Sequence, residues 1–182
     1  PPNEMHSQGE ISSSQGIIDN NPFPYYIAMI ESIDYEMGRL LRTIPSDQKE
    51  NTLIIFLGDN GTPGKVIQAP YENNRSKGSL HQGGIHVPLV ISGPLVTRKG
   101  ERDQSLIHTA DIFSTIAEAA GISESKYFNS QSFYNTLSNS STTYSRPFRT
   151  ADSQSNTLSG SAVVIAVWIA RDQRIQALTE SG

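Results

Sequence analysis

The chain contains no cysteine among its 182 residues. This excludes a disulfide framework, a thiolate metal site and a cysteine nucleophile within the chain. No apolar run approaches the roughly 18 consecutive residues that a membrane-spanning helix needs. The formal net charge is only -4, which gives no reason to expect nucleic acid or an acidic membrane surface as a partner. The length is sufficient for one domain with a hydrophobic core.

The sequence also lacks a recognisable secretion signal at its start. A signal peptide has a basic region followed by an apolar region. The chain starts with Pro1-Pro2-Asn3-Glu4, which has no initiator methionine, and neither region follows it. We interpret the chain as beginning partway through a longer protein, so the missing signal leaves the compartment open.

The most informative stretch begins with the uninterrupted apolar run at residues 53–57, Leu-Ile-Ile-Phe-Leu. Such a run is typical of a strand buried on both faces of a parallel sheet. Gly58 ends it, and Asp59 and Asn60 follow at once. Ligands of open α/β sheets bind at the carboxyl ends of the strands, and carboxylate and carboxamide oxygens are ligands that Ca²⁺ or Mg²⁺ prefers. These two side chains are therefore candidate metal ligands.

A turn is the alternative interpretation of Asp59-Asn60-Gly61, because these residue types favour turns. A hairpin turn would be followed directly by a second strand. A long polar loop follows instead at residues 62–76, and loops of this length in compact domains are usually functional or mobile. The continuation of the chain thus favours a binding site over a simple turn.

Lys77 lies just after this loop, and its ammonium group could bind a sulfate or phosphate oxygen. His81 is a second candidate substrate contact, although a loop histidine satisfied by solvent is the alternative. Gly83 and Gly84 would let the backbone approach another segment closely.

Periodicity and turn signals predict the remaining elements. Apolar residues at three- and four-residue steps predict an amphipathic helix between Pro24 and Pro45. Residues 89–92 are predicted to form a strand, and residues 107–120 a helix that Gly121 ends. Residues 1–23 are predicted to be an extended loop with a solvent-exposed His6, residues 46–51 a polar turn, residues 133–137 a helical turn and residues 162–178 a β-hairpin.

Four blocks, in this order, resemble the second half of the sulfatase family of the alkaline phosphatase superfamily. They are the helix at residues 26–41, the strand ending in Asp59-Asn60-Gly61, the KGSLHQGGIHVP segment at residues 77–88, and HTADIFSTIAEAAGI at residues 108–122. Each block is weak alone, but their order makes the match specific. The WIARDQRIQAL segment at residues 168–178 resembles the small C-terminal antiparallel sheet of the family.

The resemblance implies an α/β fold with a mostly parallel sheet flanked by helices and the start of that antiparallel sheet. It divides the chain into residues 1–137 of the catalytic domain, a Ser/Thr/Asn-rich linker at residues 138–161 and a truncated hairpin subdomain at residues 162–182. It implies a sulfuric ester hydrolase, with Asp59 and Asn60 as ligands of Ca²⁺ or Mg²⁺ and Lys77, together with His81, on the sulfate. A periplasmic or extracellular location is compatible with the family.

The resemblance also implies parts that this chain does not contain. Sulfatases use a formylglycine made within a C/S-x-P-x-R motif that precedes the metal-binding strand. Residues 145–149, SRPFR, fit that motif by letter, but they follow the strand, so we reject the match. We therefore assign no catalytic residue, expect the nucleophile upstream in a missing N-terminal half, and expect the isolated chain to be inactive.

Two alternatives to a sulfatase remain open at this point. A phosphodiester or phosphonate monoester hydrolase of the same superfamily would share the framework. A degenerate, non-catalytic module is favoured slightly by Gln82 and His86, where many sulfatases have Glu and Arg. Aryl sulfates, sulfated glycans and sulfated lipids all remain candidate substrates.

Overall fold

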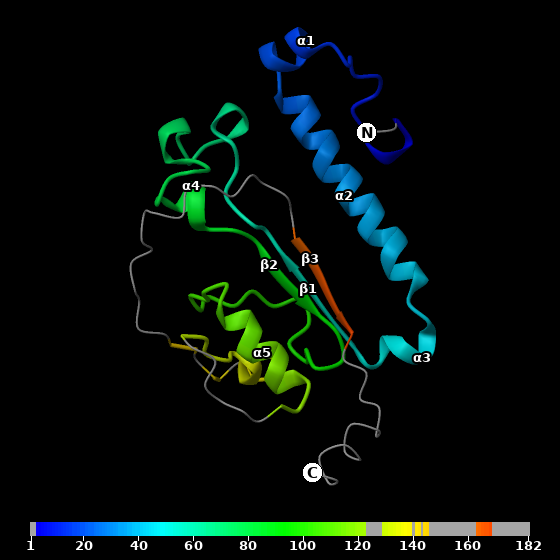
Figure 1. The fold of residues 1–182 in the computed structure, drawn as a ribbon, viewed down its shortest axis with the longest axis vertical. Helices are drawn as coiled ribbons and strands as arrows, with labels where there is room; N and C mark the ends of the chain where they lie inside the picture. Colours follow the sequence, from blue (N-terminus) through cyan, green and yellow to red (C-terminus); the bar gives the residue numbers. More distant parts are fainter. Residues whose placement is uncertain (1–2, 123–128, 140, 143, 146–162, 169–182) are drawn as a thin grey trace, which may run out of the picture. The chain divides into compact units, whose positions relative to one another are not determined.

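The computed structural model describes residues 3–122, 129–139, 141, 142, 144, 145 and 163–168 of the chain. These residues form two compact units, whose elements are labelled in Figure 1. One unit contains residues 3–45 and 58–88, and the other contains residues 46–57 and the described residues from 89 onward. No helix among the described residues is long and apolar enough to cross a membrane.

The first unit contains the longest helix, α2 (Phe23–Thr43). Pro24 lies in its first turn, where the missing N–H of proline costs nothing. Ile44 is extended and Pro45 follows it, because the residue before a proline disfavours helical geometry. The helix predicted between Pro24 and Pro45 is confirmed. Its apolar stripe stays open to solvent in part, since Ile30, Ile33 and Leu40 are each more than a third exposed.

The predicted extended loop at residues 1–23 is wrong in two places. A short 3₁₀ turn, η1 (Asn3–Met5), and the helix α1 (Gln15–Asn20) interrupt it. His6 is half-buried rather than exposed, and its Nδ1 accepts a hydrogen bond from the Gln8 backbone N–H at 3.3 Å. The segment is held to α2 because the backbone N–H and the hydroxyl of Ser7 donate to the Glu31 carboxylate at 2.8 and 2.5 Å.

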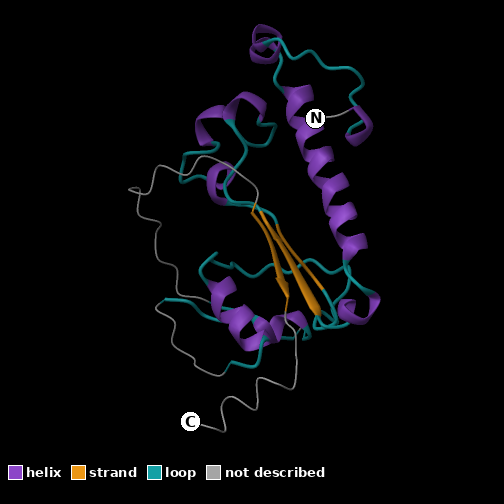
Figure 2. Cartoon of the chain, turned by 45° about the vertical axis from the view of Figure 1, so that its right-hand side comes forward, coloured by secondary structure: helices purple, strands orange, loops and turns teal. Residues whose placement is uncertain are grey.

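The second unit is built on a three-stranded sheet in the order β2-β1-β3 (Figure 2). The central strand β1 (Thr52–Leu57) pairs with β2 (Leu89–Ser92) and with β3 (Val163–Trp168). In the register, Ile55 lies opposite both Ile91 and Ile165. The strands predicted at residues 53–57 and 89–92 are confirmed.

The parallel sheet that we expected is not formed by the described strands, because both pairings of β1 are antiparallel. The apolar run at residues 53–57 indicates that the strand is buried, but it does not determine the direction of the neighbouring strands. Burial is also uneven between the two faces: Leu53 and Ile55 are 1 % and 0 % exposed, while Ile54 and Phe56 are only half-buried. Alternate residues of a strand share one face, so Leu53 and Ile55 mark the more deeply buried face of β1.

That buried face packs against the helix α5 (Asp111–Ala119) and the 3₁₀ turn η4 (Tyr134–Leu137). Ile112, Phe133 and Tyr144 join Leu53 and Ile55 in the core. The predicted helix at residues 107–120 is confirmed from residue 111 onward, whereas residues 107–110 precede it without helical structure.

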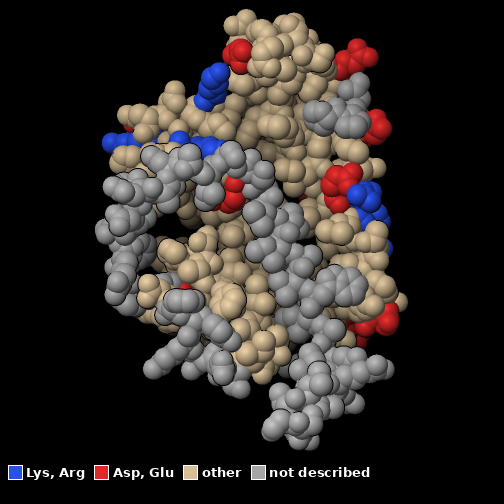
Figure 3. Space-filling model, in the orientation of Figure 1, with Lys and Arg blue, Asp and Glu red and all other residues tan. Residues whose placement is uncertain are grey.

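Short elements complete the described fold. They are the helix α3 (Ser46–Lys49) within the predicted polar turn, the 3₁₀ turns η2 (Gly64–Val66) and η3 (Asn73–Arg75) within the predicted long loop, and the helix α4 (Gln82–Ile85). The second arm of the predicted hairpin and most of the predicted linker lie outside the described residues. On the face drawn in Figure 3, the acidic and basic side chains of the described residues are scattered singly or in small groups.

Candidate functional site

Asp59 and Asn60 follow Gly58 at the end of β1, so a carboxylate and a carboxamide lie next to each other there. The Asn60 Nδ2 donates a hydrogen bond to the Asp59 Oδ2 at 2.5 Å. Asp59 is exposed and Asn60 is half-buried. The Gly58 backbone N–H donates to the Pro88 carbonyl at 2.9 Å, which fixes the backbone just before the pair. The two side chains lie together after the strand, and their assignment as metal ligands stays a prediction.

Gly61 anchors the next step of the loop. Its N–H donates to the Gly84 carbonyl at 2.9 Å. A Cβ atom at this position would lie 2.0 Å from the Gly83 carbonyl oxygen and 2.6 Å from the Gly84 Cα. Only glycine fits such an approach of two backbones. The paired glycines at residues 83 and 84 thus provide the close approach that their sequence predicts.

Lys77 joins the same region through its backbone, because its N–H donates to the Thr62 carbonyl at 2.9 Å. Thr62 is three residues beyond Asp59 in the chain, and the Lys77 side chain is half-buried. The backbone hydrogen bonds of Gly58, Gly61 and Lys77 therefore tie the segment after β1 to residues 77–88 within one compact unit.

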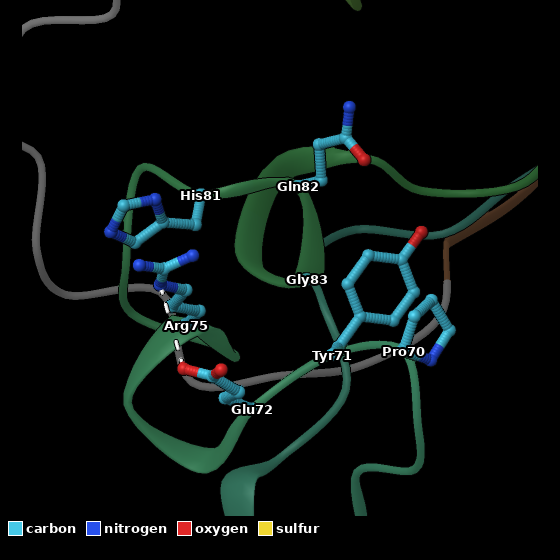
Figure 4. A pocket seen from close by; sticks show the side chains of 7 residues that line it. All are labelled: Pro70, Tyr71, Glu72, Arg75, His81, Gln82 and Gly83. Atoms are coloured by element: carbon cyan, nitrogen blue, oxygen red, sulfur yellow. Dashed lines mark ion pairs between the residues drawn. The ribbon is translucent and has the colours of Figure 1, made fainter.

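His81 immediately precedes α4, and its carbonyl accepts hydrogen bonds from the N–H groups of Gly84 and Ile85 at 2.8 and 3.1 Å. Its exposed imidazole lines a pocket of about 280 Å³ (Figure 4). The residues that line this pocket are Pro70, Tyr71, Glu72, Arg75, His81, Gln82 and Gly83. We did not predict the pocket from the sequence, and the only signal for it was the unusual length of the loop at residues 62–76.

The chemistry of Asp59 and Asn60 fits part of a calcium or magnesium site. Both supply hard oxygen atoms, and the hydrogen bond between their side chains shows that the two groups reach the same point. Ca²⁺ takes about 6–8 oxygen ligands. Among the described residues, no cluster of three or more His, Cys, Asp and Glu side chains could hold a metal ion. The two side chains alone therefore do not complete such a site among the described residues.

The residues that depart from the expected family pattern lie in the same segment. Gln82 is exposed and lines the pocket beside His81. His86 is exposed and follows α4, with its N–H donating to the Gln82 carbonyl at 2.9 Å. The rejected formylglycine-like motif begins at Ser145, and its other residues, 146–149, lie outside the part of the chain that the structure describes.

Comparison with known proteins finds relatives that are named as sulfatases. The chain is 32% identical to an arylsulfatase of Klebsiella aerogenes, over 56% of this chain and 30% of the relative. It is 31% identical to a sulfatase of Formosa agariphila, over 53% of this chain and 19% of the relative. It is 27% identical to the human steryl-sulfatase, over 64% of this chain and 22% of the relative. No solved structure is significantly similar to it.

The chain therefore spans less than a third of the length of these relatives. The sulfatase family model matches residues 2–122, which include Asp59, Asn60, Lys77 and His81. This match covers well over half of the chain and confirms the resemblance seen in the sequence. The chain belongs to the sulfatase family.

Proposed function

We propose that the chain supplies the metal-binding and sulfate-binding residues of an enzyme that hydrolyses sulfate esters. The observation that carries the proposal is the set of backbone hydrogen bonds that ties the segment after β1 to the Lys77 segment. In this arrangement a carboxylate, a carboxamide and an ammonium group come from two short, mutually anchored segments. Sulfate ester hydrolysis at a metal needs two things from the protein. Oxygen atoms must bind the metal ion, and a positively charged side chain must bind the anionic sulfate.

In the proposed enzyme, Asp59 and Asn60 hold Ca²⁺ or Mg²⁺ through their side-chain oxygens. Asn60 would hold the cation through its amide oxygen, because its amide nitrogen, the present donor to Asp59, is not a metal ligand. The bound metal supplies Lewis-acid polarisation of the sulfate oxygens. The remaining oxygen ligands come from outside the described residues.

Lys77 binds a sulfate oxygen in this proposal. Its backbone is fixed by the hydrogen bond to Thr62, and its ammonium group is a compact charge that suits a sulfate oxygen. His81 contacts the ester oxygen or the group attached to it, since its imidazole faces the pocket beside α4. The nucleophile, a formylglycine, belongs to a segment upstream of this chain.

The test joins this chain to its upstream coding sequence and measures hydrolysis of 4-nitrophenyl sulfate and 4-nitrophenyl phosphate. We expect turnover of the sulfate ester by the extended protein and none by the 182-residue chain. Lys77→Gln should lower kcat/KM by about 10²–10³-fold, as expected for loss of a charge that stabilises the transition state. Lys49→Gln, at an exposed lysine of α3, is the matched control and should change nothing.

Other results would contradict the proposal in distinct ways. A clear preference for the phosphate ester would assign the protein to the phosphodiester or phosphonate monoester hydrolases. Inactivity of the extended protein on both esters would favour the non-catalytic module. Equal activity of Lys77→Gln and Lys49→Gln would remove Lys77 from the site.

A further inference from the structure

The pocket beside His81 is a built feature of one compact unit. Arg75 ends η3, and its N–H donates to the Glu72 carbonyl at 2.9 Å. A Cβ on Gly83 would lie 2.3 Å from the Arg75 carbonyl oxygen and 3.1 Å from the Ile67 Cδ1. The first turn of α4 is thus pressed against the end of η3. This contact sets the positions from which Arg75 and His81 enter the pocket.

Hydrogen bonds within residues 73–79 fix the turn that leads from η3 toward α4. Ser76, which is 5 % exposed, donates its hydroxyl to the Asn73 carbonyl at 2.5 Å, and its own carbonyl accepts from the Ser79 N–H at 3.0 Å. A Cβ on Gly84 would lie 2.1 Å from the Ser79 carbonyl oxygen. The backbone next to the pocket is therefore closely packed, while Tyr71, Arg75 and His81 are exposed.

The rim has two chemically different sides. In Figure 4, Arg75 and His81 lie together on one side with Glu72, and the Tyr71 ring lies with Pro70 on the other. Tyr71 is 38% exposed, so its ring is available for contact. An aromatic ring on one side of a small pocket and charged or hydrogen-bonding groups on the other suit a ligand with an apolar ring face and a polar edge.

The Arg75 guanidinium already faces a carboxylate, but only loosely. Its Nε lies 3.7 Å from the Glu72 Oε2, and the two side chains are 57% and 65% exposed. A charge-assisted N–H···O bond is about 2.7–2.9 Å long, and arginine binds carboxylates best through two such bonds. Exposed ion pairs of this kind contribute little to stability. A ligand carboxylate can therefore displace Glu72 at small cost and bind Arg75 more closely.

We propose that this pocket binds an acidic sugar ring of the substrate, with the sugar carboxylate on Arg75 and the apolar face of the ring on Tyr71. This inference rests on the proposed function, because it makes the pocket the binding site for the part of the substrate beyond the sulfate group. His81 and Gln82 then donate or accept hydrogen bonds at the sugar hydroxyls. The preferred substrate class is a sulfated polysaccharide that contains uronic acid, rather than a sulfated lipid.

The test compares two unsulfated ligands that differ only at C6, methyl β-glucuronide and methyl β-glucoside. Binding to the 182-residue chain is followed by NMR chemical shifts. We expect the glucuronide to bind about two- to fivefold more tightly than the glucoside, as an ion pair at an exposed arginine allows. Because neither ligand carries a sulfate, the result does not depend on the metal or on Lys77.

Two arginines provide matched variants. Arg75 pairs with Glu72 and Arg39 pairs with Glu36, each three residues apart on an exposed surface. Arg75→Gln should abolish the preference for glucuronide, and Arg75→Lys should retain part of it because lysine keeps the charge but loses the planar fork. Arg39→Gln should leave both affinities unchanged. Tyr71→Ala should weaken both ligands.

Three results would overturn the inference. The first is equal binding of the two ligands, and the second is an equal effect of Arg75→Gln and Arg39→Gln on binding. The third is that Lys77→Gln loses glucuronide binding while Arg75→Gln keeps it. The last would place the carboxylate at the proposed sulfate position instead. If the extended protein does not hydrolyse the sulfate ester but the chain still binds the glucuronide, the proposed function is rejected and the inference about the pocket stands.

Discussion

At the scale of single residues, the conformation of the loop after β1 requires glycine at positions where a side chain would clash with backbone atoms. Gly61 is buried, and the nearest atoms to a Cβ built on it belong to the backbone of Gly83 and Gly84. Backbone cannot move aside as the end of a flexible side chain can. The contact between these glycines therefore determines how the Asp59 segment and the α4 segment are placed together.

Gly61→Ala should destabilise the chain by about 1–3 kcal/mol, the usual cost of forcing extra atoms into a packed region. The measurement is urea unfolding followed by circular dichroism. Gly16→Ala is the control, because a Cβ there meets nothing within 4 Å and its effect should stay within about 0.5 kcal/mol. Equal unfolding midpoints for the two variants would show that the loop backbones do not meet as described.

A second residue-scale effect concerns pH. Hydrogen bonds from Ser105, and then from the Arg98 guanidinium, lower the pKa of Asp103 below its usual 3.8. The Arg98 Nη1 lies 2.6 Å from the Asp103 Oδ2. Because the folded-state pKa is lowered, the stabilising contribution is present above the usual value and is lost as the pH falls through the folded-state pKa.

Asp103→Asn should therefore lower the free energy of unfolding at neutral pH and have a smaller effect at strongly acidic pH, because the carboxyl group of the wild type becomes protonated as the pH falls. Urea unfolding at the two pH values measures this difference. Asp34→Asn, at an exposed position of α2, should show no such pH dependence. A constant difference between Asp103→Asn and wild type at both pH values would rule out the contribution of the ionised group.

At the scale of elements, α5 is fastened by a carboxylate at its first residue. Asp111 is 0% exposed, and its side chain accepts hydrogen bonds from the Tyr144 hydroxyl at 2.6 Å, the Gln131 N–H at 3.0 Å and the His108 N–H at 3.1 Å. Negative charge at a helix N-terminus is favourable, and a buried carboxylate needs donors. Asp111 thus connects α5 to the chain segments around residues 131 and 144.

Tyr144→Phe should cost about 1–3 kcal/mol, because it leaves the buried Asp111 with one donor fewer. Burial raises the pKa of Tyr144, so its hydroxyl stays protonated as a donor throughout the neutral range. Urea unfolding measures the loss. Tyr35→Phe, at an exposed tyrosine of α2, should be neutral, and an equally neutral Tyr144→Phe would show that this contact does not hold α5.

The elements also show what the sequence could predict. The helix between Pro24 and Pro45 was predictable because proline and apolar spacing act locally. Strand β1 was predictable from its apolar run, but the direction of its neighbours was not, since pairing depends on residues far away in the sequence. The helix starting at Asp111 rather than near Ile107 reflects the Asp111 contacts with Gln131 and Tyr144, which local spacing does not reveal.

The candidate site is a different case, because its assignment stays a prediction. Asp59, Asn60 and Lys77 were proposed from a strand followed by polar residues and from a loop of unusual length. Their backbone anchoring depends on hydrogen bonds from Gly61 to Gly84 and from Lys77 to Thr62, and no local pattern gives these pairs. The Arg75 and Tyr71 side of the pocket was missed because an arginine and a tyrosine in a polar loop carry no distinctive spacing.

At the scale of the whole molecule, the chain matches only 19–30% of the length of the Formosa and Klebsiella relatives. The proposed metal ligands within the described residues are accordingly few. A site with two protein ligands should bind Ca²⁺ weakly, with a dissociation constant of roughly 10⁻⁴–10⁻³ M or weaker. Weak binding at a defined pair of side chains is the property that distinguishes a partial metal site from an ordinary turn.

Calorimetric titration of the 182-residue chain with Ca²⁺ tests this central claim most directly. The account predicts weak binding at one site that is lost in Asp59→Ala and retained in Asp34→Ala, whose carboxylate lies exposed on α2. Binding of the same strength in Asp59→Ala as in the wild-type chain, or no measurable difference between the two variants, would contradict it.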